Sequence, residues 1–95
     1  MNLSPFLEQL RHVCRENNVA KLGVFGSVSR GDDTPESDID LLIEFKKPVG
    51  LIGFIKLEDI FVEVLGRKVD LATEAALHPL IRQSVMNDLK IIYEN

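Results

Sequence analysis

The amino-acid sequence predicts an α/β domain with a small mixed β-sheet and helices packed on one face of that sheet. Segments with strand-like alternation of apolar and polar residues take turns with segments whose apolar residues recur at helical spacing. The resulting order is helix, strand, loop, strand, helix, strand, helix and a short final strand, which is typical of a sheet layered against helices. With 95 residues, the chain is expected to form a single domain over residues 1–95.

The first half of the chain contains a helix and two strands. The helix begins at Ser4, a good N-cap, and stops at Asn17 and Asn18. Residues 20–25 (AKLGVF) are rich in strand formers. The polar segment 26–37 (GSVSRGDDTPES) has the composition of a turn-rich loop, although it also allows a short helical turn.

The clearest strand covers residues 38–45 (DIDLLIEF), where apolar residues at every second position face the core. A helix is predicted over residues 51–65, with Gly66 as its C-cap. Its apolar stripe is expected to be buried and consists of Leu51, Phe54, Leu57, Phe61 and Val64 or Leu65.

The last third of the chain is predicted to add a strand, a helix and a short final strand. The strand covers residues 68–72 (KVDLA), and the helix begins near His78 and Pro79. Residues 90–93 (KIIY) favour a strand over further helix. The helix is expected to present four apolar residues to the core, namely Leu80, Ile81, Val85 and Leu89.

Composition and charge narrow the functional class. With 45% hydrophobic and 27% charged residues, the chain has the profile of an ordinary globular domain, and we expect a cytoplasmic protein with no membrane contact. No apolar run approaches the ~18 residues of a membrane span, and the first residues lack a secretory signal's hydrophobic stretch. A net charge of −4 argues against direct nucleic acid binding. The single cysteine, Cys14, allows no internal disulfide and is expected to be a core residue.

Three acidic residues indicate the chemistry. Asp38 and Asp40 project from one face of the same strand, roughly 6–7 Å apart along it. The pair suits Mg²⁺ or Mn²⁺, although it equally fits carboxylates at a solvated strand end. Asp70 lies within an otherwise apolar strand and reaches the same surface if the two strands are neighbours. Three carboxylates there would form a two-metal site for phosphoryl displacement, with Asp70 as metal ligand, general base or both.

A phosphate-binding loop is expected beside these acids. Gly26 and Ser27 follow the first strand directly, and backbone N–H groups and a hydroxyl in such a turn can bind phosphate oxygens. Arg30 adds a cation able to bind phosphate in bidentate fashion. Other phosphate and cation motifs are excluded. Two acids stand where a Walker A loop needs Lys and Ser or Thr, and leucines stand where an EF-hand needs a ligand and glycine.

Taken together, the pair Gly26-Ser27, ten intervening residues and Asp38-Ile39-Asp40 resemble the signature of the DNA polymerase β-type nucleotidyltransferase superfamily. The longer stretch GVFGSVSRGDDTPESDIDLLIEF resembles its smallest branch, the minimal nucleotidyltransferases (MNT domains), and KVDLA matches the family's third-carboxylate strand. The resemblance implies a polymerase β-like fold and transfer of a nucleoside monophosphate from an NTP, with ATP as substrate and two Mg²⁺ ions as cofactors.

The resemblance also implies residue roles. Asp38, Asp40 and Asp70 would be the catalytic and metal-binding residues, whereas Gly26, Ser27 and Arg30 would contact the nucleotide phosphates.

Many MNT proteins resemble antitoxins paired with a HEPN-domain toxin, so the implied partner is such a toxin and the implied reaction is its adenylylation. Since the chain has no acceptor domain, the acceptor would come from another protein or a second copy, which implies a homo- or hetero-oligomer. Two alternatives stay open: an antitoxin that neutralises its partner by binding alone, and a small-molecule transferase like the aminoglycoside nucleotidyltransferases.

Overall fold

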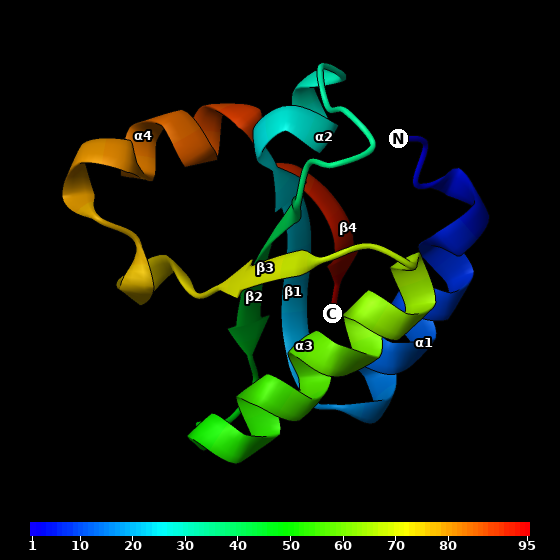
Figure 1. Cartoon of the computed structure of the whole chain (residues 1–95). Coiled ribbons are helices and arrows are strands. Elements are labelled where there is room, and N and C mark those ends of the chain that lie inside the picture. The colour runs from blue at the N-terminus through cyan, green and yellow to red at the C-terminus, as the bar shows by residue number, and fades with distance from the viewer.

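The computed structural model describes residues 1–95 and contains a four-stranded mixed sheet in the order β3-β2-β1-β4 (Figure 1). The elements in chain order are η1 (Ser4–Phe6), α1 (Leu7–Glu16), β1 (Val19–Phe25), α2 (Gly26–Arg30), β2 (Ile39–Phe45), α3 (Leu51–Leu65), β3 (Val69–Ala72), η2 (Glu74–Ala76), α4 (Pro79–Asp88) and β4 (Lys90–Glu94). β2 and β3 run parallel, whereas β1 is antiparallel to both β2 and β4. The predicted α/β class and mixed sheet are confirmed.

One face of the sheet forms the main core, because α1 and α3 cover it (Figure 1). The largest side chains that are almost completely buried come from these two helices and the central strands: Phe61, Leu10, Leu22, Ile39, Leu41, Val19 and Cys14. Burial raises the pKa of the Cys14 thiol to about 12, so this cysteine is a core residue, as predicted.

The opposite face carries a smaller apolar cluster. Leu42 of β2, Leu77 directly after η2, and Val85 of α4 are buried together there. The prediction of helices on one face therefore holds for α1 and α3, whereas α4 lies against the other face (Figure 1). Leu42 explains the position of α4, because it is an apolar residue on the otherwise polar side of β2 and its burial under α4 removes apolar surface from water.

Some residues expected in the core are exposed. Leu51 is 74% exposed because the first turn of α3 lies beyond the ends of the strands (Figure 1), and Ile52 in the same turn and Ile55 in the next are also exposed. Leu80 and Ile81 are 87% and 50% exposed, since α4 touches the sheet mainly through its second half.

The helix and strand boundaries largely follow the predictions. Asn18 and Gly66 adopt positive φ angles of 56° and 69° after α1 and α3, which ends both helices where expected. The short helical turn allowed after the first strand is present as α2, and the last strand forms. Ser4 does not cap α1, because a 3₁₀ turn precedes that helix. No helix combines the length and hydrophobicity that a membrane span requires.

Candidate active site

The parallel pairing of β2 and β3 places Asp40 directly beside Asp70. The two residues are register partners, on strands about 4.8 Å apart. The residues flanking Asp40 and Asp70 in sequence are buried in the main core, so both carboxylates project from the opposite face. Asp38 lies just before β2, two residues from Asp40. The structure therefore places the three acids near one another, at the N-terminal ends of the parallel strands β2 and β3.

Electrostatics confirm that these acids influence one another. Burial raises the pKa of the half-buried Asp40, and the negative charges of Asp70 and Asp38 raise that pKa further, against a lowering by Arg30. Asp70 itself is exposed, and Asp38 is paired only loosely, at 3.8 Å, with the exposed ammonium of Lys68. The carboxylate cluster thus has more negative charge than its neighbours neutralise.

These donors fit a magnesium site, although they do not form a closed cage. No group of three or more His, Cys, Asp or Glu side chains is gathered closely enough to hold a metal ion without rearrangement. Like charges repel, so carboxylates are not expected to close on one another without a cation between them. Mg²⁺ prefers one or two carboxylates together with substrate phosphates, and Asp40 with Asp70 offers that donor set.

Gly26 is required where the first strand meets this cluster. Its φ of +71° lies in the left-handed region, and a Cβ atom there would collide with the carboxylate of Asp40. β1 places the preceding residue, Phe25, opposite Asp40 in the sheet. The half-buried Ser27 follows, so the predicted phosphate-binding residues lie at the edge of the carboxylate cluster.

Arg30 is held by acids. Its guanidinium donates to the carboxylate of Asp88 at 2.7 Å and to that of Asp32 at 3.2 Å, and these hydrogen bonds raise its pKa. Ser29, which is buried, donates from its hydroxyl to the backbone carbonyl of Asp88. A role for Arg30 in phosphate binding stays a prediction, and the observed contacts join α2 to the end of α4.

Sequence reasoning missed Asp88 and also Arg67, which fixes the loop before Asp38. The Arg67 guanidinium donates to the carboxylate of Asp33 at 3.1 Å and to the carbonyls of Thr34 and Ser37 at 2.8 and 2.6 Å. The hydrogen bonds from Arg30 to Asp88 and from Arg67 to the loop have no local sequence signal, because the partners are 30 or more positions apart. The excess of acidic residues in the loop before Asp38 was the one sequence feature that indicated a basic partner for it.

The chain matches a known family over nearly its whole length. Residues 7–92 match the family model described as a nucleotidyltransferase domain. The chain therefore belongs to this family.

Curated relatives identify a narrower group within the family. The chain is 37% identical to protein adenylyltransferase MntA of Thermococcus cleftensis, over 75% of this chain and 74% of that protein. It is 31% identical to MJ0435 of Methanocaldococcus jannaschii, provisionally named a protein adenylyltransferase, over 93% and 95% of the two chains.

Solved structures share the fold. A structure provisionally described as a minimal nucleotidyltransferase matches with a TM-score of 0.79 and 30% identity, covering 95% of both chains. The complex of a tri-AMPylated Shewanella oneidensis HEPN toxin with its MNT antitoxin matches with a TM-score of 0.74 and 19% identity, covering 99% of this chain and 74% of that one. The chain is thus an enzyme of the minimal nucleotidyltransferase group, related to MntA antitoxins.

Proposed function

We propose that this chain transfers AMP from ATP to a hydroxyl group of a HEPN-domain partner and thereby acts as its antitoxin. The observation that carries the proposal is the register of Asp40 with Asp70, immediately beside Gly26. Relatives named as protein adenylyltransferases support the reaction, and the MNT antitoxin bound to an AMPylated HEPN toxin supports the partner.

The acidic residues and the Gly26-Ser27 pair have different roles in the proposed reaction. Asp38, Asp40 and Asp70 would hold Mg²⁺, which supplies neutralisation of the triphosphate charge when it is bound. Gly26 presents a close, side-chain-free surface to the phosphates, and the hydroxyl of Ser27 donates to them. These positions orient the α-phosphate of ATP over the acids.

Asp70 is suited to the proton transfer, since it is the exposed member of the carboxylate cluster. The acceptor oxygen attacks the α-phosphorus and forms a new P–O bond. The bond between that phosphorus and the oxygen bridging to the β-phosphate breaks, and pyrophosphate leaves. The hydroxyl proton passes to the Asp70 carboxylate. Access from solvent at Asp70 allows another protein's side chain to reach the site.

The experiment compares wild type with Asp70→Asn, using Asp59→Asn on the exposed surface of α3 as the matched control. Each protein is incubated with ATP, Mg²⁺ and a purified HEPN-domain toxin, and intact-mass spectrometry counts adenylyl groups. We expect wild type and Asp59→Asn to modify the toxin and Asp70→Asn to leave it unmodified. Equal neutralisation of the toxin's ribonuclease activity by all three proteins, without any adduct, would instead show an antitoxin that acts by binding.

A further inference from the structure

The helix α2 has only 5 residues, and it begins with Gly26 and Ser27, the two residues proposed to bind the phosphates. A helix this short is not stable by itself in water, so contacts from other segments must set its position. β1 leads directly into α2 and fixes its first residue. The contacts that hold its other end come from the last residue of α4 and the first residue of β4.

Three hydrogen bonds join the second half of α2 to residues 88–90. The Arg30 guanidinium donates to the Asp88 carboxylate at 2.7 Å. The Ser29 hydroxyl donates to the backbone carbonyl of Asp88, and the Lys90 ammonium donates to the backbone carbonyl of Ser29 at 2.7 Å. The partners are 58 or more positions apart in the sequence, so folding alone brings them together.

The ion pair between Arg30 and Asp88 is partly shielded from water. The Asp88 side chain is only 19% exposed, and the neighbouring Ser29 is buried. A charge-assisted hydrogen bond is stronger there than between fully exposed groups. The other acid at Arg30 is Asp32, which is 61% exposed and more distant, at 3.2 Å. Asp88 is therefore the main anchor of the guanidinium.

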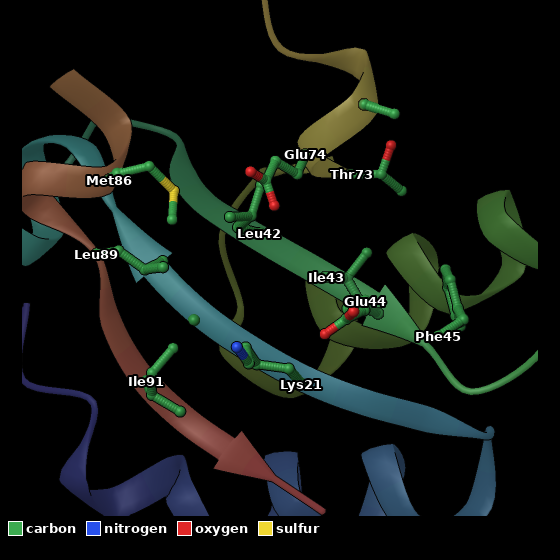
Figure 2. A pocket seen from close by; sticks show the side chains of 12 residues that line it. Lys21, Leu42, Ile43, Glu44, Phe45, Thr73, Glu74, Met86, Leu89 and Ile91 are labelled. Atoms are coloured by element: carbon green, nitrogen blue, oxygen red, sulfur yellow. The ribbon is translucent and has the colours of Figure 1, made fainter. Parts of the chain in front are cut away.

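The position of Asp88 is in turn fixed by its neighbour Leu89, which lies on β1 (Figure 2). A Cβ atom at Gly23 of β1 would collide with the Leu89 side chain, so bare backbone there lets the end of α4 approach the central strand. Leu89 and Met86 also line a cavity of about 270 Å³ that opens on the same face of the sheet as the carboxylate cluster (Figure 2). The anchor of α2 thus rests on the strand from which α2 itself starts.

We propose that Asp88 is a positioning residue for the nucleotide, which holds α2 through Arg30 and thereby sets where the phosphate-binding residues lie. Those residues, Gly26 and Ser27, contact the triphosphate in the proposed function, on which this inference rests. Arg30 then has a structural role, because acids already hold its guanidinium. Gly26 is so close to Asp40 that a Cβ atom would collide with its carboxylate, so a small rotation of α2 displaces the phosphate contacts from the carboxylate cluster.

The first test measures how tightly the chain binds a non-hydrolysable ATP analogue in the presence of Mg²⁺. Asp88→Asn removes the charge that holds Arg30, and we expect it to weaken analogue binding about 10-fold. Asp32→Asn is the matched control, since it removes the other acid at Arg30 and leaves Asp88 in place. Its affinity should stay within about 2-fold of wild type. Asp88→Glu keeps the carboxylate and should bind within about 3-fold of wild type.

Several results of this test would overturn the inference. Unchanged analogue binding by Asp88→Asn, or a variant that does not fold, would limit Asp88 to a role in the fold. Tighter binding would show that Asp88 withholds Arg30 from the phosphates. Equal weakening by Asp32→Asn or by Asp88→Glu would show that the Asp88 carboxylate is not the anchor. In contrast, absence of transfer by a wild-type protein that binds the analogue would count against the proposed function alone.

The second test needs no nucleotide. The Gly31 amide donates to the carbonyls of Ser27 and Val28, so its hydrogen exchange reports the opening of α2. We expect Asp88→Asn to accelerate exchange at Gly31 about 10-fold and to leave the amides of the central strand β1 unchanged. Equal acceleration at Gly31 and in β1 would show a general loss of stability. An unchanged rate at Gly31 would contradict the anchoring of α2 by Asp88.

Discussion

On one face of the sheet, β1 and β2 bury leucine, isoleucine and valine side chains under α1 and α3; on the other face, the same strands carry Asp40, bare Gly23 and Glu44. The first face is lined by apolar side chains, whose burial supplies most of the stability of the domain. The second face has crowded carboxylates, a cavity and only a small apolar cluster beneath α4. Residues adjacent in sequence therefore serve different purposes, which makes stability and activity separable by substitution.

The largest effect is expected from removing a carboxylate on the open face. Asp38→Ala or Asp40→Ala should reduce Mg²⁺-dependent adenylyl transfer by about 100-fold or more, because the proposed Mg²⁺ site loses one of its carboxylate ligands. Intact-mass or radiolabel assays measure the loss. Circular dichroism should show an unchanged fold, since Asp40 is repelled by its neighbours in the free protein. An unfolded Asp40→Ala protein would contradict the conclusion that one face of the sheet supplies stability and the other supplies activity.

A core substitution should have the reverse pattern. Phe61 of α3 is completely buried, and Phe61→Ala should lower the free energy of unfolding by about 3–5 kcal/mol. That is a large share of the roughly 5–15 kcal/mol available to a small domain. Urea denaturation measures the change, with Leu80→Ala on exposed α4 as the control that should alter stability by less than about 0.5 kcal/mol.

Substitutions at Gly26 and Gly31 separate the effect of backbone strain at positive φ from the effect of displacing Asp40. Both adopt positive φ, at +71° and +80°, so either substitution by alanine should cost about 1–2 kcal/mol of stability. A Cβ at Gly31 would meet nothing, whereas one at Gly26 would displace Asp40. Only Gly26→Ala should reduce transfer, by roughly 10- to 100-fold. Equal activities in the two variants would show that the contact between Gly26 and Asp40 has no catalytic importance.

The smallest effect concerns acid stability. The Met1 ammonium, followed by the Arg67 guanidinium, lowers the pKa of Asp33. Because the pKa is lower in the folded state, the carboxylate stabilises the fold above its ordinary value near 3.9, and this contribution is lost as pH falls through the folded pKa. Asp33→Asn should therefore lose less stability than wild type between about pH 5 and pH 2. If the urea midpoints of wild type and Asp33→Asn fell by the same amount over this pH range, the ion pairs of Asp33 with Met1 and Arg67 would not contribute to stability.

Much of the fold could be predicted from local patterns. Period-two alternation located β2 and β3, and the alternation of Asp70 with buried neighbours indicated the face it shares with Asp40. Glycine after α3 marked its end correctly. These features depend on residues close in sequence, for which spacing determines orientation.

Features that depend on distant contacts could not be predicted. Leu80 looked like a core residue because helical spacing reveals a stripe but not how far the helix overlaps the sheet. The pairing of Arg30 with Asp88 and the clamp of Arg67 on the loop join residues that only the folded chain brings together. The cavity of about 270 Å³ beside the end of α4 has the same origin, since its lining comes from four separate segments of the chain.

The central claim is that the carboxylates beside Gly26 bind a divalent cation together with the nucleotide. Paramagnetic broadening by Mn²⁺, with a non-hydrolysable ATP analogue present, tests it on the ¹⁵N-labelled protein. We expect the amide signals of Gly26, Asp40 and Asp70 to broaden first and those of α1, around Cys14, to stay sharp. Broadening centred elsewhere, or an unchanged pattern in Asp40→Asn, would contradict it.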